Sequence, residues 1–131
     1  MPRITALYAG LLLALFLLLT FRVFGARMRA DIMLGHGGDR ALERAARVHA
    51  NFAEYAPIFL VALALAEMCG APAPAVHALG AAMLLGRALH AIGMSREPDI
   101  RPLRGAGMLF TLVGLFGAAA LALGAGLGLW R

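Results

Sequence analysis

Hydrophobic residues dominate four stretches of this 131-residue chain, and polar residues gather between them. The stretches run from Ile4 to Phe24, Arg47 to Ala66, Ala73 to Met94 and Gly105 to Trp130. A helix that crosses the apolar part of a bilayer needs about 20 apolar residues. The first and fourth stretches meet that length, whereas charged residues interrupt the second and third. The pattern predicts one domain over residues 1–131, an all-α integral membrane bundle with helices over about 4–24, 40–68, 73–94 and 104–130.

The second stretch is unusual because ionisable side chains and an amide, between Glu43 and Pro57, precede its apolar part without a break. Both parts are predicted to form one helix. The 11 residues from Ala56 to Ala66 extend only about 16 Å at about 1.5 Å per residue, too little to cross a bilayer. The polar turns must therefore lie near or inside the membrane boundary, where a charge exposed to lipid costs about 2.5 to 3.5 kcal/mol. We interpret them as a functional site.

The first stretch has a second interpretation, a cleaved signal peptide. Its apolar core, from Ile4 to Phe21, exceeds the usual length of about 7–15 residues, and no Ala-x-Ala site follows it. Val23-Phe24-Gly25 is a passable small-residue cleavage site. The length of the core favours a permanent membrane span.

Composition agrees with a membrane protein, since 62% of the residues are hydrophobic and the mean hydropathy is +0.82. All twelve basic residues are arginines. Six lie between positions 22 and 47 and three between positions 96 and 104, around two connections that share one side of a four-span chain. The positive-inside rule places these connections in the cytoplasm and both termini outside. We do not interpret the net charge of +5 as a nucleic-acid surface.

Other motifs indicate connection and packing. A single cysteine, Cys69, excludes an intrachain disulfide and a thiolate metal cluster, and the histidines lack metal-ligand spacing. The glycine-rich residues 35–39 lack the signature of a phosphate loop, and Asp39 is a predicted N-cap. Small residues spaced by four predict close helix packing; they are Ala78, Ala82 and Gly86, then Gly114, Ala118 and Ala122, then Gly124 and Gly128.

Polar side chains of the second helix share one face. At about 100° per residue, a sector of about 100° holds five of them, namely Arg44, Arg47, Asn51, Glu54 and Tyr55. His49 points the opposite way, and Pro57 is expected to kink the helix just beyond this face. A salt bridge from Arg47 to Glu54 that holds the bundle together is the simpler alternative, and it accounts for two residues only. Arginine binds carboxylate, glutamate binds ammonium and asparagine binds amide, so the face suits a zwitterion such as glutathione.

These residues resemble the helix-two motif of the membrane-associated proteins in eicosanoid and glutathione metabolism, the MAPEG family. The matching residues are Glu43, Arg44, Arg47, Asn51, Glu54, Tyr55 and Pro57, and Arg87 followed by His90 is similar to a second motif of the family. The glycine-rich connector is most similar to the small bacterial branch. The resemblance implies a homotrimer in a bacterial inner membrane, with periplasmic termini and glutathione bound between protomers near the cytoplasmic face.

The resemblance also implies roles for single residues. Those that would bind glutathione from one protomer are Arg44, Arg47, Asn51, Glu54, Tyr55, Arg87 and His90. His49 would reach the ligand of the adjacent protomer. Met94 stands where the eicosanoid branch has a tyrosine, so one hydroxyl contact is missing. The thiol-activating arginines would be Arg104 (with Arg101 as the alternative) and Arg27 (with Arg22 as the alternative).

The function implied is a glutathione transferase or peroxidase-like enzyme. A free thiol with a pKa of about 8.5 is mostly protonated at neutral pH, and a guanidinium beside it favours the nucleophilic thiolate. The expected co-substrate is glutathione, the expected partner a lipophilic electrophile from the membrane, and no metal is expected. One alternative is a non-catalytic lipid- or glutathione-binding member of the family. The other is a small multidrug exporter, but such exporters keep an essential glutamate in the first helix, which here has none.

Overall fold

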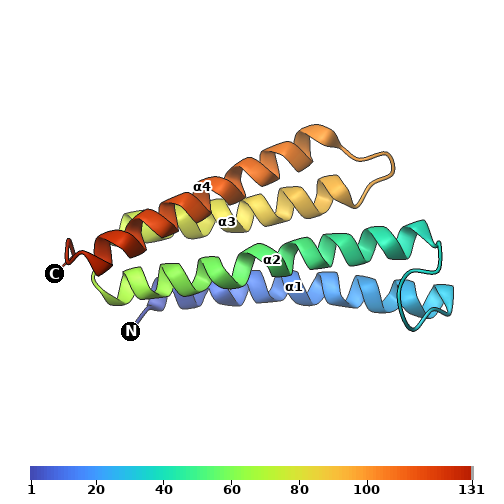
Figure 1. Cartoon of the computed structure of the whole chain (residues 1–131), viewed down its shortest axis with the longest axis horizontal. Helices are drawn as coiled ribbons and strands as arrows, with labels where there is room; N and C mark the ends of the chain where they lie inside the picture. The colour runs from blue at the N-terminus through green and yellow to red at the C-terminus, as the bar shows by residue number, and fades with distance from the viewer. Residues whose placement is uncertain (131) are drawn as a thin grey trace.

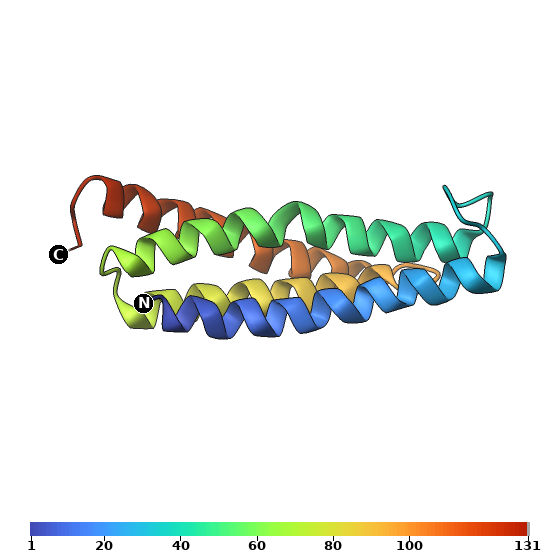
Figure 2. The same cartoon turned by 90° about the horizontal axis from the view of Figure 1, so that it is seen from below.

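The computed structural model describes residues 1–130 and contains four helices in that range. They are α1 (Arg3–Ala30), α2 (Arg40–Met68), α3 (Ala73–Met94) and α4 (Arg101–Gly126). Figure 1 shows them along one long axis, with both ends of the chain at one end of the bundle and the two longer connections at the other. The view turned by 90° shows the same arrangement (Figure 2). Each helix is long and apolar enough to cross a membrane, which confirms the predicted four-helix membrane bundle.

The surface of α1 shows how a membrane helix packs on its neighbours. Its buried residues recur every seventh position, as Thr5, Leu12, Leu19 and Ala26. Such a repeat produces a narrow seam along one side of a helix. The large hydrophobic residues on the remaining surface, such as Leu18 and Phe21, are exposed. Hydrophobicity all round α1 therefore suits a helix with one seam against protein and the rest against lipid.

Helix α1 is longer than predicted, since it continues past Phe24 to Ala30. Arg27 and Arg29 lie in its last turn, where basic side chains interact favourably with the helix dipole. Asp31 ends the helix in the left-handed conformation, with φ of 53°. The polar residues that made this segment look like a connector are thus part of the helix.

Helix α2 begins and continues as the sequence predicts. The Asp39 carboxylate accepts a hydrogen bond of 2.7 Å from the backbone N–H of Leu42, which confirms Asp39 as the N-cap. The helix then runs without interruption through Pro57 to Met68. The polar turns and the apolar turns therefore belong to one element, as predicted.

The predicted bounds of the fourth helix, 104–130, are wrong at both ends. The helix begins at Arg101 because Pro102 suits the first turn, where its missing N–H is not needed. It ends at Gly126, and Gly128 has a φ of 73° in the turn that follows. Trp130 then folds back, and its indole N–H donates to the carbonyl of Leu121 at 3.0 Å. The spacing of Gly124 and Gly128 had predicted a helix-packing pair. Because Gly128 lies beyond the end of the helix, the two glycines do not form one.

Glu67 ties the first two helices together at the end of the bundle that holds the termini. Its carboxylate accepts hydrogen bonds from the backbone N–H groups of Ile4 and Thr5, at 2.9 Å and 2.7 Å, and from the Thr5 hydroxyl at 2.7 Å. Pro2, at the N-cap position of α1, provides no side-chain cap. A carboxylate from α2 thus satisfies the free amides of the first turn of α1.

Glycines let α3 and α4 approach closely, and this is the most extensive helix pair in the bundle. A Cβ atom on Gly107 would lie 2.3 Å from the backbone nitrogen of His90. A Cβ atom on Gly86 would lie 2.7 Å from the backbone nitrogen of Thr111. The predicted packing role of Gly86 is confirmed, and Gly107 is the residue that meets it from α4.

Replacing Gly107 by alanine should therefore destabilise the protein. The new methyl group would meet backbone atoms, which cannot move aside cheaply, and overpacking of this kind costs about 1–3 kcal/mol. Gly105→Ala is the matched control, because no atom lies within 4 Å of its added Cβ and alanine favours a helix by up to about 1 kcal/mol over glycine. Thermal unfolding in detergent, followed by circular dichroism, measures both. Equal stabilities of the two variants would contradict the close approach.

Candidate functional site

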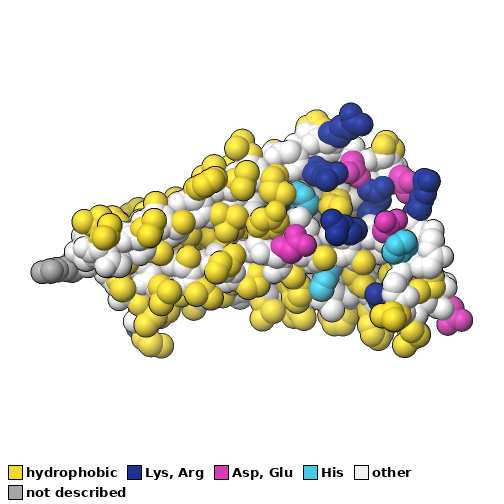
Figure 3. Space-filling view, in the orientation of Figure 1, with side chains coloured by type: hydrophobic (Ala, Val, Ile, Leu, Met, Phe, Trp, Pro, Cys, Tyr) yellow, Lys and Arg dark blue, Asp and Glu magenta, His cyan; other side chains and the backbone are white. Residues whose placement is uncertain are grey.

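Charged side chains gather at the end of the bundle that holds the two longer connections (Figure 3). These connections are residues 31–39, between α1 and α2, and residues 95–100, between α3 and α4. The rest of the face shown is largely hydrophobic. The prediction that the arginines around both connections share one side of the molecule is confirmed.

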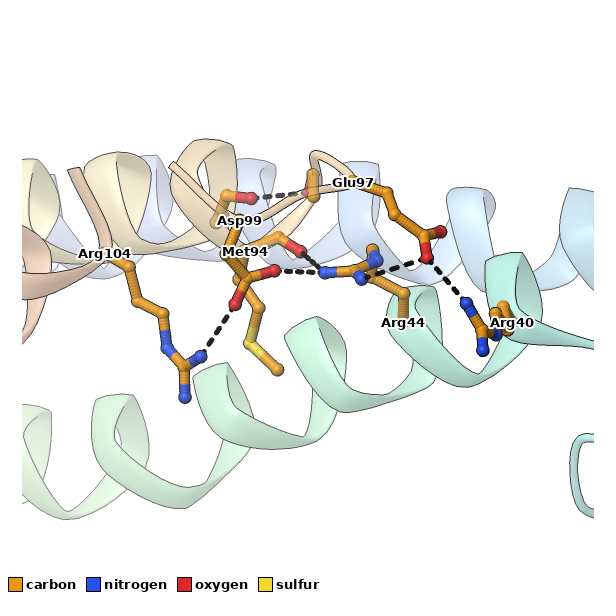
Figure 4. A network of polar contacts seen from close by, with 8 residues as sticks. Arg40, Arg44, Met94, Glu97, Asp99 and Arg104 are labelled. Carbon is orange, nitrogen blue, oxygen red and sulfur yellow. Dashed lines mark hydrogen bonds and ion pairs between the residues drawn. The ribbon is translucent and has the colours of Figure 1, made fainter. Parts of the chain in front are cut away.

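Asp99 joins two helices within this charged end. One of its carboxylate oxygens accepts a hydrogen bond from Arg44 of α2, and the other accepts one of 2.7 Å from Arg104 of α4 (Figure 4). Arg44 also donates to the backbone carbonyl of Met94 at 3.1 Å. Hydrogen bonds from Arg44 and then Arg104 lower the pKa of Asp99, so this carboxyl stays ionised.

Glu97 provides a second, more exposed contact between the same connection and α2. Its carboxylate lies 3.3 Å from a guanidinium nitrogen of Arg40 and 4.0 Å from one of Arg44. The side chains of Arg40 and Glu97 are 82% and 52% exposed, and exposed pairs contribute little to stability. Asp99 is therefore the stronger anchor of the connection.

Arg87 is buried in the middle of the protein, with 1% of its surface exposed. Its Nε donates to the Thr111 hydroxyl of α4 at 3.1 Å, and one Nη donates to the Asn51 side-chain oxygen of α2 at 2.8 Å and to the Asn51 carbonyl at 3.1 Å. Its guanidinium carbon lies 5.3 Å from the centre of the Tyr55 ring, within reach of a cation–π interaction. One guanidinium thus connects three helices.

The polar face predicted for α2 is divided by these contacts. Asn51 and Tyr55 point toward Arg87 and contact its guanidinium group inside the protomer. Arg47 and Glu54 are exposed, and within residues 1–130 no ion pair joins them to each other or to another side chain. The simpler alternative, a stabilising salt bridge between Arg47 and Glu54, is therefore not formed within this protomer.

An open cavity of about 330 Å³ lies beside the exposed part of that face. Its lining residues are Arg40, Glu43, Arg44, Arg47, Met94 and Glu97. Met94 contributes the only uncharged side chain. The cavity is therefore a polar site with excess positive charge at the same end as the ion-pair network.

Two histidines from the predicted site take different positions. His49 lies on the side of α2 that faces α1, where its Nε2 is 3.1 Å from the Thr20 hydroxyl and its ring is 4.5 Å from that of Phe16. This is the direction opposite to Arg47, as the helical spacing predicts. His90 is buried, with 3% exposed, where α3 meets Gly107 of α4.

Residues 5–124 match the family model described as the MAPEG family. The chain belongs to the MAPEG family. Two similar proteins are both named inner membrane protein YecN, one from Escherichia coli strain K12 and one from Escherichia coli O6:H1 strain CFT073. Each is 39% identical to this chain over 90 residues, which cover 69% of this chain and 69% of the relative. The family resemblance identified from α2 is confirmed.

The candidate thiol-activating arginines of this MAPEG protein lie in different surroundings. Arg104 is 51% exposed and pairs with Asp99. Arg27 donates to three backbone carbonyls of the α1–α2 connection, those of Ile32, Met33 and Gly35, at 3.0–3.3 Å. Arg22 donates to the Ser95 hydroxyl at 2.8 Å, and Arg101 is exposed at the start of α4. A role of Arg27 or Arg104 in activating a thiol stays a prediction.

Three residues of the charged end and of the buried cluster were not singled out by the sequence. Thr111 is the only hydroxyl in the fourth hydrophobic stretch, and that isolation was the available signal for a buried polar contact. Asp99 and Glu97 are the only acids between α3 and α4, in a connection that holds Arg96 and is followed by Arg101 and Arg104. Arg104, one partner of Asp99, is five residues away, but the partners on α2 lie about 55 residues away, so sequence spacing could not assign those contacts.

Thr111→Val should destabilise the protein because it removes the acceptor of Arg87 Nε while keeping the shape of the side chain. A hydrogen bond to a charged group contributes about 1.5–3 kcal/mol. Thr111→Ser is the matched control, since it keeps the hydroxyl and loses one methyl group, worth about 0.8 kcal/mol. Unfolding in detergent by a denaturing surfactant measures the difference. A valine variant as stable as the serine variant would rule out an important Arg87–Thr111 bond.

Asp99→Asn should loosen the α3–α4 connection, because one charge then no longer holds Arg44 and Arg104. Faster hydrogen exchange is expected at the amides of Ile100 and Arg104, whereas Glu97→Gln, at a more exposed pair, should have a smaller effect. In the wild type, the pKa of Asp99 is lowered. The stabilisation that its ionised carboxylate gives to the connection is therefore complete above the ordinary pKa of 3.8 and is lost only as pH falls through the lowered value. Protection corrected for intrinsic exchange should therefore be constant from about pH 8 to 5, and a decline in that range would contradict the assignment.

Proposed function

We propose that this MAPEG protein is a membrane glutathione transferase, which binds glutathione between the protomers of a homotrimer and transfers it to lipophilic electrophiles. The observation that carries the proposal is the exposed pair of opposite charges, Arg47 and Glu54, on α2. Glutathione has carboxylates, an ammonium group, peptide amides and a thiol. Arg47 suits a carboxylate through two parallel hydrogen bonds, and Glu54 suits the ammonium group.

A neighbouring protomer is part of this proposal because Arg47 and Glu54 lie uncovered on a membrane-spanning helix. A charge exposed to lipid costs about 2.5 to 3.5 kcal/mol. Contact with a second copy of the chain and with glutathione would remove both side chains from lipid. His49, on the other side of α2, is the residue that we assign to the ligand of the next protomer, in line with the family resemblance.

We place the charged end of the bundle in the cytoplasm and both termini in the periplasm. The positive-inside rule favours this orientation, since the arginines around both longer connections lie at one end. The relatives are named as inner membrane proteins, and we assign the same membrane to this chain. Glutathione would then enter from the cytoplasm, and the electrophile from the lipid.

Arg104 is the residue to which we assign activation of the thiol. Its guanidinium, at the start of α4 and 51% exposed, would lie beside the sulfur and favour the thiolate by charge. The thiol proton passes to water, the sulfur lone pair forms a carbon–sulfur bond, and the bonding pair departs with the leaving group. Arg27 is the second candidate, from the end of α1 of a neighbouring protomer.

A non-catalytic glutathione- or lipid-binding protein is the second candidate function, and a specific observation favours it. Both candidate arginines already have partners within the protomer, Arg104 in Asp99 and Arg27 in the carbonyls of the α1–α2 connection. In an enzyme, the sulfur would have to share one of these guanidinium groups. A non-catalytic binding protein would need neither guanidinium group to contact the sulfur.

The test combines binding and turnover in purified, detergent-solubilised protein. Arg47→Ala or Glu54→Ala should weaken glutathione binding in calorimetry by about 1.5–3 kcal/mol, the range for hydrogen bonds to charged groups. Arg104→Ala should leave binding largely intact and lower turnover with an aryl chloride, because its interaction is made with the thiolate. Arg3→Ala, an exposed arginine at the opposite end, is the control and should change neither.

Native mass spectrometry of the same sample should show three chains, with glutathione bound to the trimer and not to monomers. If the wild type does not bind glutathione, the proposed function fails. If it binds but Arg104→Ala and Arg27→Ala both keep the wild-type turnover and thiol titration, no arginine activates the sulfur and the non-catalytic function is correct.

A further inference from the structure

A second cavity, of about 280 Å³, lies at the charged end on the α1 side of Arg44. It is formed by the last turns of α1, the first turns of α2 and the α3–α4 connection. Its polar lining consists of Arg22, Arg29, Arg44, Ser95 and Glu97. Arg47 and Glu54, which carry the proposed function, are not part of it.

The charges around this cavity do not balance. Three guanidinium groups face one carboxylate, and that carboxylate, Glu97, is already paired with Arg40. Arg44 is paired with Asp99, and Arg22 donates to the Ser95 hydroxyl. Arg29 makes no side-chain hydrogen bond or ion pair within residues 1–130. The cavity therefore has surplus positive charge and free donors, as a site for an anion does.

The sequence of α1 keeps space between two of these arginines. Arg22 and Arg29 are seven residues apart, two helical turns, so they lie on one face of α1. Gly25 and Ala26 lie between them on the cavity wall, and no side chain of Gly25 fills the space. Small residues of α2, such as Ala41, form the wall opposite. Both arginines therefore line one open depression, with an Nη of Arg29 3.5 Å from where a Cβ of Gly25 would lie.

The surroundings of the cavity indicate that the anion has an apolar part. Phe21 belongs to the lining and is 70% exposed, and Leu17 and Leu18, one turn earlier on α1, are 46% and 59% exposed. These side chains continue from the arginines along the part of α1 that is apolar enough to lie in the membrane. An amphiphile at the membrane boundary meets both surfaces at once.

We infer that this cavity binds the phosphate of an anionic phospholipid headgroup. Arg22 and Arg29 donate to the phosphate oxygens, as arginine does to phosphate, and the acyl chains lie along Phe21 and the leucines that precede it. A free phosphate ion could use the same donors but would gain nothing from the apolar surface. The inference does not depend on glutathione binding, because Arg29 and Gly25 have no role in the proposed transferase site.

The test measures binding of phosphatidylglycerol to the full-length protein in detergent by native mass spectrometry, with phosphatidylcholine and inorganic phosphate as the comparison probes. Phosphatidylglycerol should bind at least about tenfold more tightly than either. Arg29→Gln should weaken its binding about tenfold, as expected for loss of a charge-assisted hydrogen bond. Equal binding of inorganic phosphate would assign the cavity to a soluble anion and overturn the lipid inference.

Two matched controls separate this site from general attraction between arginines and anionic lipid. Arg101→Gln removes the same charge at the same end but outside the cavity lining, and should leave binding within about twofold of the wild type, a negligible free-energy change. Gly25→Leu fills the cavity without changing charge and should weaken binding, whereas Gly10→Leu, at an exposed position of the same helix, should not. Equal losses for Arg29→Gln and Arg101→Gln, or full binding by Gly25→Leu, would refute the site.

Discussion

The burial of one arginine is the constraint on which the bundle depends. Arg87 lies inside the protein on α3, where a charge is stabilised by acceptors for its donors. Two of its three nitrogens, Nε and one Nη, have acceptors, whereas the other Nη has none within residues 1–130. Those acceptors come from Asn51 on α2 and Thr111 on α4. The rotation and height of three helices are therefore coupled to one guanidinium group, because a shift of any of them would leave a further donor buried without a partner.

Two glycines make that arrangement possible. Thr111 reaches Arg87 only if α4 lies very close to α3, and Gly86 and Gly107 meet at this approach. In a membrane, where lipid is as apolar as the side chains, close packing and buried polar contacts provide much of the force between helices. The glycine contact and the Arg87 cluster therefore support each other, and together they make α3 and α4 the most extensive pair in the bundle.

The arginines of the charged end fall into two groups once the contacts are known. Some hold the connections in place, as Arg27 does through backbone carbonyls and Arg44 does through Asp99. Others, chiefly Arg47 and Arg29, are left without side-chain partners within residues 1–130. These two border different cavities. One basic end of the bundle therefore both holds the connections in place and leaves two arginines free beside two separate cavities.

Much of the fold could be predicted from the sequence. Hydropathy determines that there are four spans, since a membrane helix must be apolar over its length. Local chemistry determines that Asp39 begins α2, and the motif around Arg47 and Glu54 was sufficient to suggest the MAPEG family, which is confirmed. Each of these features depends on residues that are close together in the chain.

Only the tertiary structure decided how the polar residues are used. Helical spacing placed Asn51 and Glu54 on one face, but the buried Arg87 turns Asn51 inward and leaves Glu54 outside. The tertiary structure also brings Asp99 to Arg44, 55 residues away. It folds Trp130 back on α4, so the helix is shorter than predicted. These outcomes depend on contacts between distant segments, and the local pattern of a sequence does not contain the distances between its helices.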